Sequence, residues 1–137
     1  MALGQLVEGK WVSKRDQEDS KGRFLRPSTT FRDRITADGS SGFKAQPDRY
    51  HLYIPWANRT AIMRSLKGLE DAIGLSVVDP VMGEEGWMFS DFPGSIPDTV
   101  NGTQYLREIY LKADPQYTGR VTVPIIWDKE RNNLHLY

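Results

Sequence analysis

The pattern of hydrophobic and polar positions becomes regular at residue 49. Residues 49–54 alternate and are rich in β-forming types, which predicts a strand. Every second residue falls on one apolar face: Tyr50, Leu52 and Ile54. Pro55 follows at once, and proline suits the first position of a helix because its missing N–H would be unpaired there anyway.

An amphipathic helix is predicted over residues 56–73. Apolar residues recur at spacings of four, three and four, so they share one helical face: Ile62, Leu66, Leu69 and Ile73. Gly74 is expected to end this helix, and residues 75–78 form a second short strand that Asp79 and Pro80 stop. A strand, a helix and a strand in this order make a βαβ unit with parallel strands.

The second half of the chain predicts a helix and two more strands. A Gly- and Pro-rich connection over 81–102 precedes a helix over 103–113. The apolar face of that helix has helical spacing: Leu106, Ile109, Tyr110 and Ala113. A buried strand is expected over 120–127, interrupted by Pro124, and a return strand over 134–137. The order β-α-β-α-β-β is that of an α/β, thioredoxin-like core without its last helix.

Residues 1–48 show no such regularity and are rich in charge, Ser, Gly and Pro. They nevertheless carry aromatic residues, which fully disordered tails rarely do. These are Trp11, Phe24, Phe31 and Phe43. We therefore expect two parts, an irregular arm over 1–48 that packs on the domain through these rings, and the α/β domain over 49–137.

Composition narrows the function classes. The 137 residues carry eighteen Lys and Arg against eighteen Asp and Glu, so no net charge favours nucleic acid or an acidic membrane as a partner. No stretch has the length of a signal-peptide core or of a membrane-spanning helix, which predicts a cytoplasmic location. There is no cysteine, which excludes disulfides, thiolate metal sites and a cysteine nucleophile within this sequence.

No metal site is predicted. His51 and His135 are the only histidines, and two histidines without cysteine make a poor zinc set, so hydrogen-bonded structural roles are favoured for both. An acidic group in and near the long connection lacks the spacing of a calcium loop and is interpreted as a solvated acidic loop. Its members are Asp79, Glu84, Glu85 and Asp91.

Short motifs in a fixed order resemble the N-terminal part of the glutathionyl-hydroquinone reductases, the Xi class of the glutathione transferase superfamily. Each motif is weak alone, and together they cover nearly the whole chain. They are Phe24-Leu-Arg-Pro27, Phe31-Arg32, Asp38-Gly39 with Gly42-Phe43, Arg49-Tyr-His-Leu-Tyr53, Pro55-Trp-Ala57, Gly86-Trp87, Tyr105-Leu106, Ala113-Asp-Pro115, Gly119-Arg-Val-Thr-Val-Pro124 and Trp127-Asp-Lys129.

The resemblance implies a thioredoxin-like, glutathione-binding domain with a cis bond before Pro124. It also implies a reaction in which a thiolate at a helix N-terminus attacks the sulfur of a glutathionyl-hydroquinone, the helix lowering the thiol pKa. Glutathione would then be ligand and substrate, quinone-type conjugates the other partners, and no metal would be required.

The sequence departs from the family at the nucleophile. The family has a short run ending in Cys before Pro-Trp-Ala, whereas here Ile54 meets Pro55 directly. Two explanations stay open, a true loss of about four residues or their omission from the sequence. The neighbouring hydroxyls of Tyr53 and Thr60 are poor nucleophiles for thiol exchange. The family's Glu-Ser pair after the last strand and its helical C-terminal domain have no counterpart in these 137 residues.

Five residues are candidates for glutathione binding by this resemblance. Trp87 is expected to contact the ligand, Val123 to pair its main chain with the cysteinyl part, and Pro124 to frame the site. Arg120 is a candidate for a glutathione carboxylate, and Trp56 lies next to the lost nucleophile. Packing in the core or a loop is the alternative for Trp56, Trp87 and Val123, and a solvated charge is the alternative for Arg120.

The function implied is that of a glutathione-dependent reductase of glutathionyl-hydroquinones, inactive as written because the nucleophile and the helical domain are missing. A non-catalytic thioredoxin-like relic and a protein-interaction module are the alternatives. The last follows from apolar surface left uncovered by the missing parts, which would favour homo-oligomers.

Overall fold

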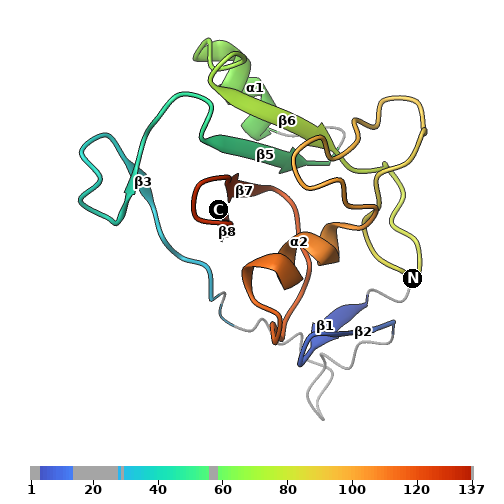
Figure 1. The fold of residues 1–137 in the computed structure, drawn as a ribbon. Helices are drawn as coiled ribbons and strands as arrows, with labels where there is room; N and C mark the ends of the chain where they lie inside the picture. Colours follow the sequence, from blue (N-terminus) through green and yellow to red (C-terminus); the bar gives the residue numbers. More distant parts are fainter. Residues whose placement is uncertain (1–3, 14–27, 29, 56–58, 137) are drawn as a thin grey trace, which may run out of the picture.

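A four-stranded mixed sheet forms the centre of the computed structural model, which describes residues 4–13, 28, 30–55 and 59–136 (Figure 1). Its strands lie in the order β6 (Ile73–Val77), β5 (Tyr50–Ile54), β7 (Ile125–Asp128) and β8 (Asn133–Leu136). β5 is parallel to β6 and antiparallel to β7, and β8 returns antiparallel to β7. With the two helices, the chain order is β5-α1-β6-α2-β7-β8, which confirms the predicted thioredoxin-like order.

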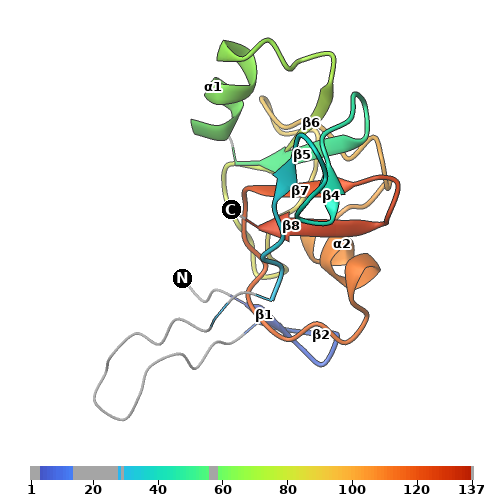
Figure 2. The ribbon, with the colours of Figure 1, turned by 90° about the vertical axis from the view of Figure 1, so that its left-hand side faces the viewer.

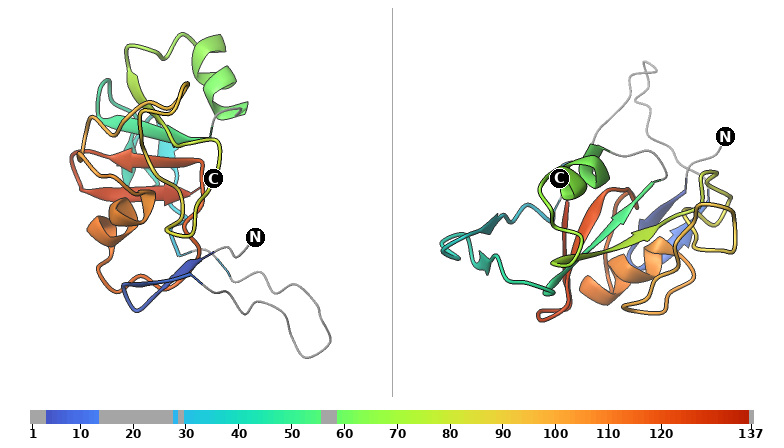
Figure 3. Two further views of the ribbon diagram at one scale, coloured as in Figure 1. Left: turned by 90° about the vertical axis from the view of Figure 1, so that its right-hand side faces the viewer. Right: turned by 90° about the horizontal axis from the view of Figure 1, so that it is seen from above.

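Both faces of the central strand β5 are buried. The face predicted from the alternation is confirmed, because Tyr50, Leu52 and Ile54 belong to one hydrophobic cluster with Val77 and Ile126. Tyr53 points to the opposite face, into the larger cluster that α2 covers. Figure 3 shows α2 and the long loop on one side of the sheet, with β3 (Ile35–Thr36) on the other.

Helix α2 (Leu106–Ala113) begins three residues later than predicted and buries the expected side chains Leu106, Ile109 and Tyr110. The Glu108 carboxylate accepts the main-chain N–H of Gln104 at 2.9 Å and of Tyr105 at 2.7 Å, which satisfies amide groups at the helix start.

Helix α1 (Arg59–Leu66) ends earlier than predicted. Gly68, not Gly74, is its C-terminal glycine, with a φ of 61°. The amides of Leu69 and Gly68 bond to the carbonyls of Arg64 and Ser65, the pair of hydrogen bonds that defines a Schellman motif. A glycine suits this left-handed position because it has no Cβ.

The apolar face predicted for this helix is not buried, which corrects the sequence interpretation. Ile62 is 61% exposed and Leu66 is 75% exposed, and α1 buries none of its residues. Two of the four residues assigned to that face lie outside the helix, since Leu69 follows its end and Ile73 begins β6. From α1, the partly buried Ala61 packs against the sheet cluster.

The strand predicted over 120–127 is also shorter. β7 begins only at Ile125, and the segment before it is not part of the sheet. Pro124 has no N–H to donate to a strand ladder, which accounts for the late start. The bond between Val123 and Pro124 is cis, as the family resemblance implied.

The N-terminal region contains two small strand pairs within otherwise irregular chain. β1 (Gln5–Val7) and β2 (Lys10–Val12) form an antiparallel hairpin, which lies at the end of the molecule opposite α1 (Figures 1 and 2). β3 and β4 (Phe43–Lys44) pair in parallel and lie in front of the sheet in Figure 2.

Aromatic residues of this region contact the α/β part. Phe31 stacks on Tyr117 with ring centres 5.5 Å apart, and Phe43 meets the ring of His135 edge-on at 4.1 Å. Phe24 lies outside the described residues. The division of the chain at residue 48 remains a prediction. Among the described residues, no helix has the length and apolarity needed to cross a bilayer.

Candidate functional site

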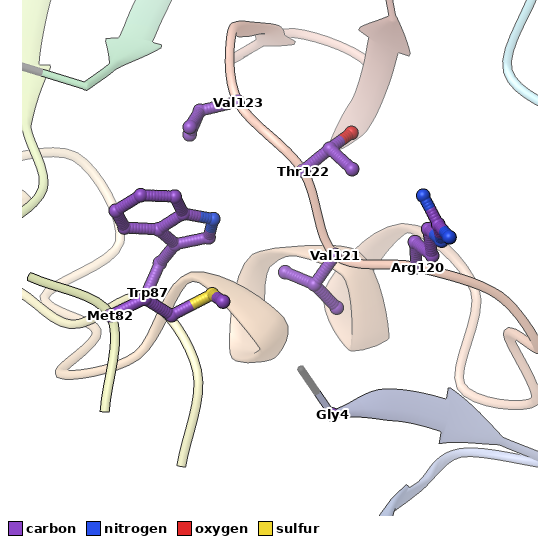
Figure 4. A pocket seen from close by; sticks show the side chains of 7 residues that line it. All are labelled: Gly4, Met82, Trp87, Arg120, Val121, Thr122 and Val123. Atoms are coloured by element: carbon purple, nitrogen blue, oxygen red, sulfur yellow. The ribbon is translucent and has the colours of Figure 1, made fainter. Parts of the chain in front are cut away.

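A cavity of about 220 Å³ lies between the segment leading into β7 and the long loop after β6 (Figure 4). Its walls come from the N-terminal region, the loop and that segment: Gly4, Met82, Trp87, Arg120, Val121, Thr122 and Val123. Three candidate ligand residues therefore lie together, namely Trp87, Arg120 and Val123. Pro124 follows Val123 directly, and Trp56 lies outside the described residues.

The segment before β7 is held from behind by α2. The hydroxyl of Tyr110 donates to the carbonyl of Thr122 at 2.9 Å and accepts the Thr122 N–H at 3.1 Å. Tyr110 is fully buried, and burial raises its pKa well above the usual range, so the hydroxyl stays protonated and able to donate. These two bonds fix the main chain of Thr122 beside Val121 and Val123.

Trp87 is positioned from the other side of the cavity. Its carbonyl accepts the N–H of Leu106, the first residue of α2, at 2.9 Å. Its half-buried side chain packs against the main core cluster, as does Val123. Figure 4 shows the indole between the side chains of Met82 and Val123. Both walls of the cavity are thus fixed to the same helix and core.

Four wall residues were not among the sequence candidates: Gly4, Met82, Val121 and Thr122. Val121 and Thr122 follow the candidate Arg120 directly, whereas Gly4 and Met82 come from other segments. Gly4 precedes β1, and the arm was expected to be irregular. A signal for the hairpin was present, because Glu8 and Gly9 form a two-residue turn between alternating residues. Both have positive φ, 47° and 76°, as a tight hairpin turn of the primed type requires. Nothing comparable in the sequence indicates Met82.

Two of the four acidic residues in and near the long loop, Asp79 and Glu85, have structural partners. Asp79 is buried, which corrects its assignment to a solvated loop. Its carboxylate accepts hydrogen bonds from Ser90 N–H, the Ser90 hydroxyl and the Ser95 hydroxyl at 3.1, 2.8 and 2.6 Å. Glu85 forms an ion pair with Arg107 at 2.6 Å. The described part of the chain gathers no set of three side chains of the metal-binding types.

The two histidines differ from each other. His51 makes the predicted hydrogen bond, with Nε2 2.8 Å from the Ser76 hydroxyl, and burial lowers its pKa to about 4. His135 is equally buried, but neither of its ring nitrogens has a hydrogen-bond partner among the described residues, contrary to the expectation. Burial lowers its pKa as well.

No thiol is available to this site, since the sequence has no cysteine. β5 ends at Ile54, Pro55 follows, and α1 begins at Arg59. The hydroxyl of Tyr53 donates to the buried carboxylate of Asp98 at 2.7 Å. Burial and this bond raise the pKa of Tyr53 far above neutrality, so its phenol does not supply a nucleophile either.

Comparisons with known proteins agree with the resemblance. The chain is 48% identical over 144 residues to glutathionyl-hydroquinone reductase YqjG of Escherichia coli, and 47% identical over 137 residues to glutathionyl-hydroquinone reductase PcpF of Sphingobium chlorophenolicum. Each match covers 96% of this chain but only 44% and 42% of the two relatives. The chain therefore spans less than half the length of these curated relatives. No protein-family model matches it.

Solved structures give the same result. A Xi-class glutathione transferase from Natrialba magadii superposes with a TM-score of 0.85 at 41% identity, over 98% of this chain and 41% of that one. The glutathione-bound structure of YqjG, a glutathione transferase homologue from E. coli K-12, has a TM-score of 0.78 at 45% identity, over 96% and 41%.

Proposed function

We propose that this chain, which is homologous to the N-terminal part of the Xi-class glutathione transferases and glutathionyl-hydroquinone reductases, binds glutathione in the cavity between Trp87 and Val123. The observation that carries the proposal is the convergence of Trp87, Arg120 and Val123 on one cavity, although they come from two distant segments. The solved structure of YqjG from E. coli has glutathione bound, which supports the choice of ligand.

The chemistry of the cavity fits a peptide-like ligand with charged ends. The main-chain groups of Thr122 are engaged by Tyr110 on the side of α2. Because Tyr110 engages the main-chain groups of Thr122, we expect those of its neighbours Val121 and Val123 to be the ones that meet the ligand. Val123 would pair with the cysteinyl part of glutathione, Arg120 with a carboxylate, and Trp87 would cover the ligand. Pro124 would frame the site, and a contact from Trp56 stays part of the proposal.

We expect glutathione to bind the chain measurably and Trp87→Ala to weaken that binding by about tenfold, ~1.4 kcal/mol. The indole forms one wall of the cavity, and its loss removes both contact area and the shielding of the polar contacts from water. Isothermal titration calorimetry measures both affinities. Phe92→Ala is a matched control, because this ring is 48% exposed and belongs to a part of the same loop outside the cavity wall. Equal affinities for the two variants would contradict the proposed site.

Catalysis is the second part of the proposal. Attack on the sulfur of a glutathionyl-hydroquinone requires a thiolate, and this sequence supplies none. The chain as written is therefore expected to hold glutathione without releasing hydroquinone. Release is measured by chromatography after incubating a glutathionyl-hydroquinone with excess glutathione and the protein. Turnover above a control without protein would overturn this part while leaving glutathione binding intact.

An interaction module is the second candidate function, and one observation favours it. α1 presents Ile62, Met63 and Leu66 at its surface, with 61%, 50% and 75% exposed. Apolar residues gathered in this way are typical of surfaces that pair with another protein or another copy. Such association is compatible with glutathione binding at the cavity. A cytoplasmic location, and the lack of nucleic-acid and membrane partners, stay predictions.

A further inference from the structure

The indole of Trp11, in the β1–β2 hairpin, lies between two glycines, one in the wall of the proposed glutathione cavity and one directly before Trp87. A Cβ placed on Gly4 would lie 2.3 Å from Trp11 Cζ2, and a Cβ on Gly86 would lie 2.8 Å from Trp11 Cη2. Distances below 3.0 Å leave no room for a side chain. Gly4 is itself a wall of the cavity, and Gly86 directly precedes Trp87. The ring thus fills the space that separates these two segments.

Polar contacts fix this arrangement. Trp11 Nε1 donates to the carbonyl of Glu84 at 3.0 Å, within the turn that leads to Trp87. The guanidinium of Arg107, from α2, lies 5.3 Å from the centre of the Trp11 ring and pairs with Glu85 at 2.6 Å. The turn before Trp87 is therefore held by the hairpin on one side and by α2 on the other.

The same hairpin is attached to the opposite wall. Leu6 of β1 is fully buried and exchanges two main-chain hydrogen bonds of 2.9 Å with Gly119, the residue before Arg120. The N–H of Glu8 donates to the Thr118 hydroxyl at 2.8 Å. One hairpin thus contacts the chain that enters each wall of the cavity, the turn before Trp87 and the segment before Arg120.

We propose that Trp11 is a positioning residue of the glutathione site, which sets Trp87 at a fixed distance from the Arg120–Val123 wall by filling the space between Gly4 and Gly86. This inference rests on the proposed function for its ligand, but the positioning itself is a property of the free protein. Trp11 is absent from the cavity walls, so it acts through the main chain that carries Trp87.

Calorimetric titration of glutathione tests the proposal with a double-mutant cycle. Trp11→Phe keeps an aromatic ring but removes the bond to Glu84, and it is expected to weaken binding by about three- to tenfold, the range for one hydrogen bond. In a Trp87→Ala background the same change should weaken glutathione binding less than twofold, because the side chain that Trp11 positions is gone. Lys10→Ala, an exposed change in the same hairpin, should leave the affinity unchanged. An equal loss with and without Trp87 would overturn the proposal, as would no loss at all.

A second readout does not depend on glutathione. The N–H of Leu106 bonds to the Trp87 carbonyl, and the N–H of Gly86 bonds to the Gly83 carbonyl. Trp11→Phe is expected to speed hydrogen exchange at both amides by several-fold and to leave the amides of β5 unchanged. Gly86→Ala should do the same, since its Cβ would collide with the ring. If wild-type protein binds no glutathione, the proposed function fails, and unchanged exchange at these two amides would separately overturn the positioning role.

Discussion

Replacing Asp128 by alanine is expected to lower the free energy of unfolding by about 3–5 kcal/mol. Its carboxylate is fully buried and accepts Arg49 Nε at 2.9 Å and an Arg49 terminal nitrogen at 2.6 Å. It also accepts the N–H groups of Glu130 and Arg131, at 3.0 and 3.2 Å, which shape the turn between β7 and β8. Alanine would leave the guanidinium, whose side chain is only 8% exposed, largely without its buried counter-charge.

The direction of this effect follows from the balance between burial and hydrogen bonding at the Asp128 carboxylate. Burial raises the pKa of Asp128, but the hydrogen bonds from Arg49 and the turn amides outweigh it, so the net pKa is lowered and the charged form is the stable one. The free energy of unfolding of an ordinary domain is about 5–15 kcal/mol. The variant would therefore be strongly destabilised and partly unfolded at moderate urea concentrations.

Urea denaturation of wild type and variant, followed by tryptophan fluorescence, measures the change. Lys129→Ala is the matched control from the same turn. Its ammonium contacts Asp48 at 2.7 Å, but the Asp48 side chain is 85% exposed, and such exposed pairs contribute about 0–1 kcal/mol. If Asp128→Ala lowers the free energy of unfolding no more than Lys129→Ala does, the buried Arg49–Asp128 pair does not stabilise the fold as predicted.

The parts of the fold that sequence reasoning predicted are those in which a local pattern and tertiary packing agree. In β5 the alternation of Tyr50, Leu52 and Ile54 coincides with a buried sheet face. In α2 the spacing of Leu106, Ile109 and Tyr110 coincides with the face that covers the core. The β-α-β-α-β-β order follows from these elements and from the turn residues between them.

The predicted boundaries are wrong where an apolar or strand-forming pattern continues past a glycine or proline that ends or delays the element. The apolar period of α1 runs on to Ile73, yet the chain leaves the helix at Gly68, whose positive φ completes the C-terminal hydrogen bonds. The same period does not reveal that Ile62 and Leu66 stay exposed, because exposure depends on what packs against the helix. Before β7, strand-forming residues surround Pro124, and the proline decides where the ladder begins.

For the candidate site, sequence reasoning indicated three of the wall residues, Trp87, Arg120 and Val123, but not the reason they meet. Trp87 and Arg120 are distant in the sequence, and only the resemblance to a family linked them. The structure brings both to one cavity through α2, which holds Trp87 by the Leu106 amide and Thr122 by the Tyr110 hydroxyl. The contribution of Trp11 could not be predicted, since it depends on close approach to two glycines from different segments.

Lowering the pH from 7 to 5 is expected to reduce the free energy of unfolding by about 2 kcal/mol through His51 alone. The ring is 3% exposed and lies beside Gly74, whose Cβ position would be 2.4 Å from His51 Nδ1. The Ser76 hydroxyl donates to the Pro97 carbonyl at 2.8 Å, so its oxygen accepts the proton of His51 Nε2. The ring therefore carries its proton on Nε2, and its burial disfavours the charged form that a second proton would create.

The sign follows from the two pKa values. Burial lowers the pKa of His51 in the folded protein to about 4, and Lys129 and Arg64 act in the same direction, while Asp98 opposes them. The unfolded chain keeps a value near 6.5, so it binds more protons than the folded chain as the pH falls. This contribution to stability is complete above pH 6.5 and is lost progressively towards pH 4. Burial also lowers the pKa of His135, so this residue likewise reduces the free energy of unfolding as the pH falls.

Urea denaturation at several pH values between 7 and 5 measures the contribution of these histidines to the free energy of unfolding separately from that of the buried carboxylates of Asp98 and Asp128. Asp98 and Asp128 have pKa values below 3.8, so they remain charged throughout this interval. His51→Gln removes the titrating group and is expected to flatten the pH dependence by about 2 kcal/mol, leaving the share of His135. Lys67→Gln, an exposed substitution, should retain the wild-type slope. A His51→Gln protein that lost stability as steeply as wild type would show that His51 does not remain neutral in the folded core.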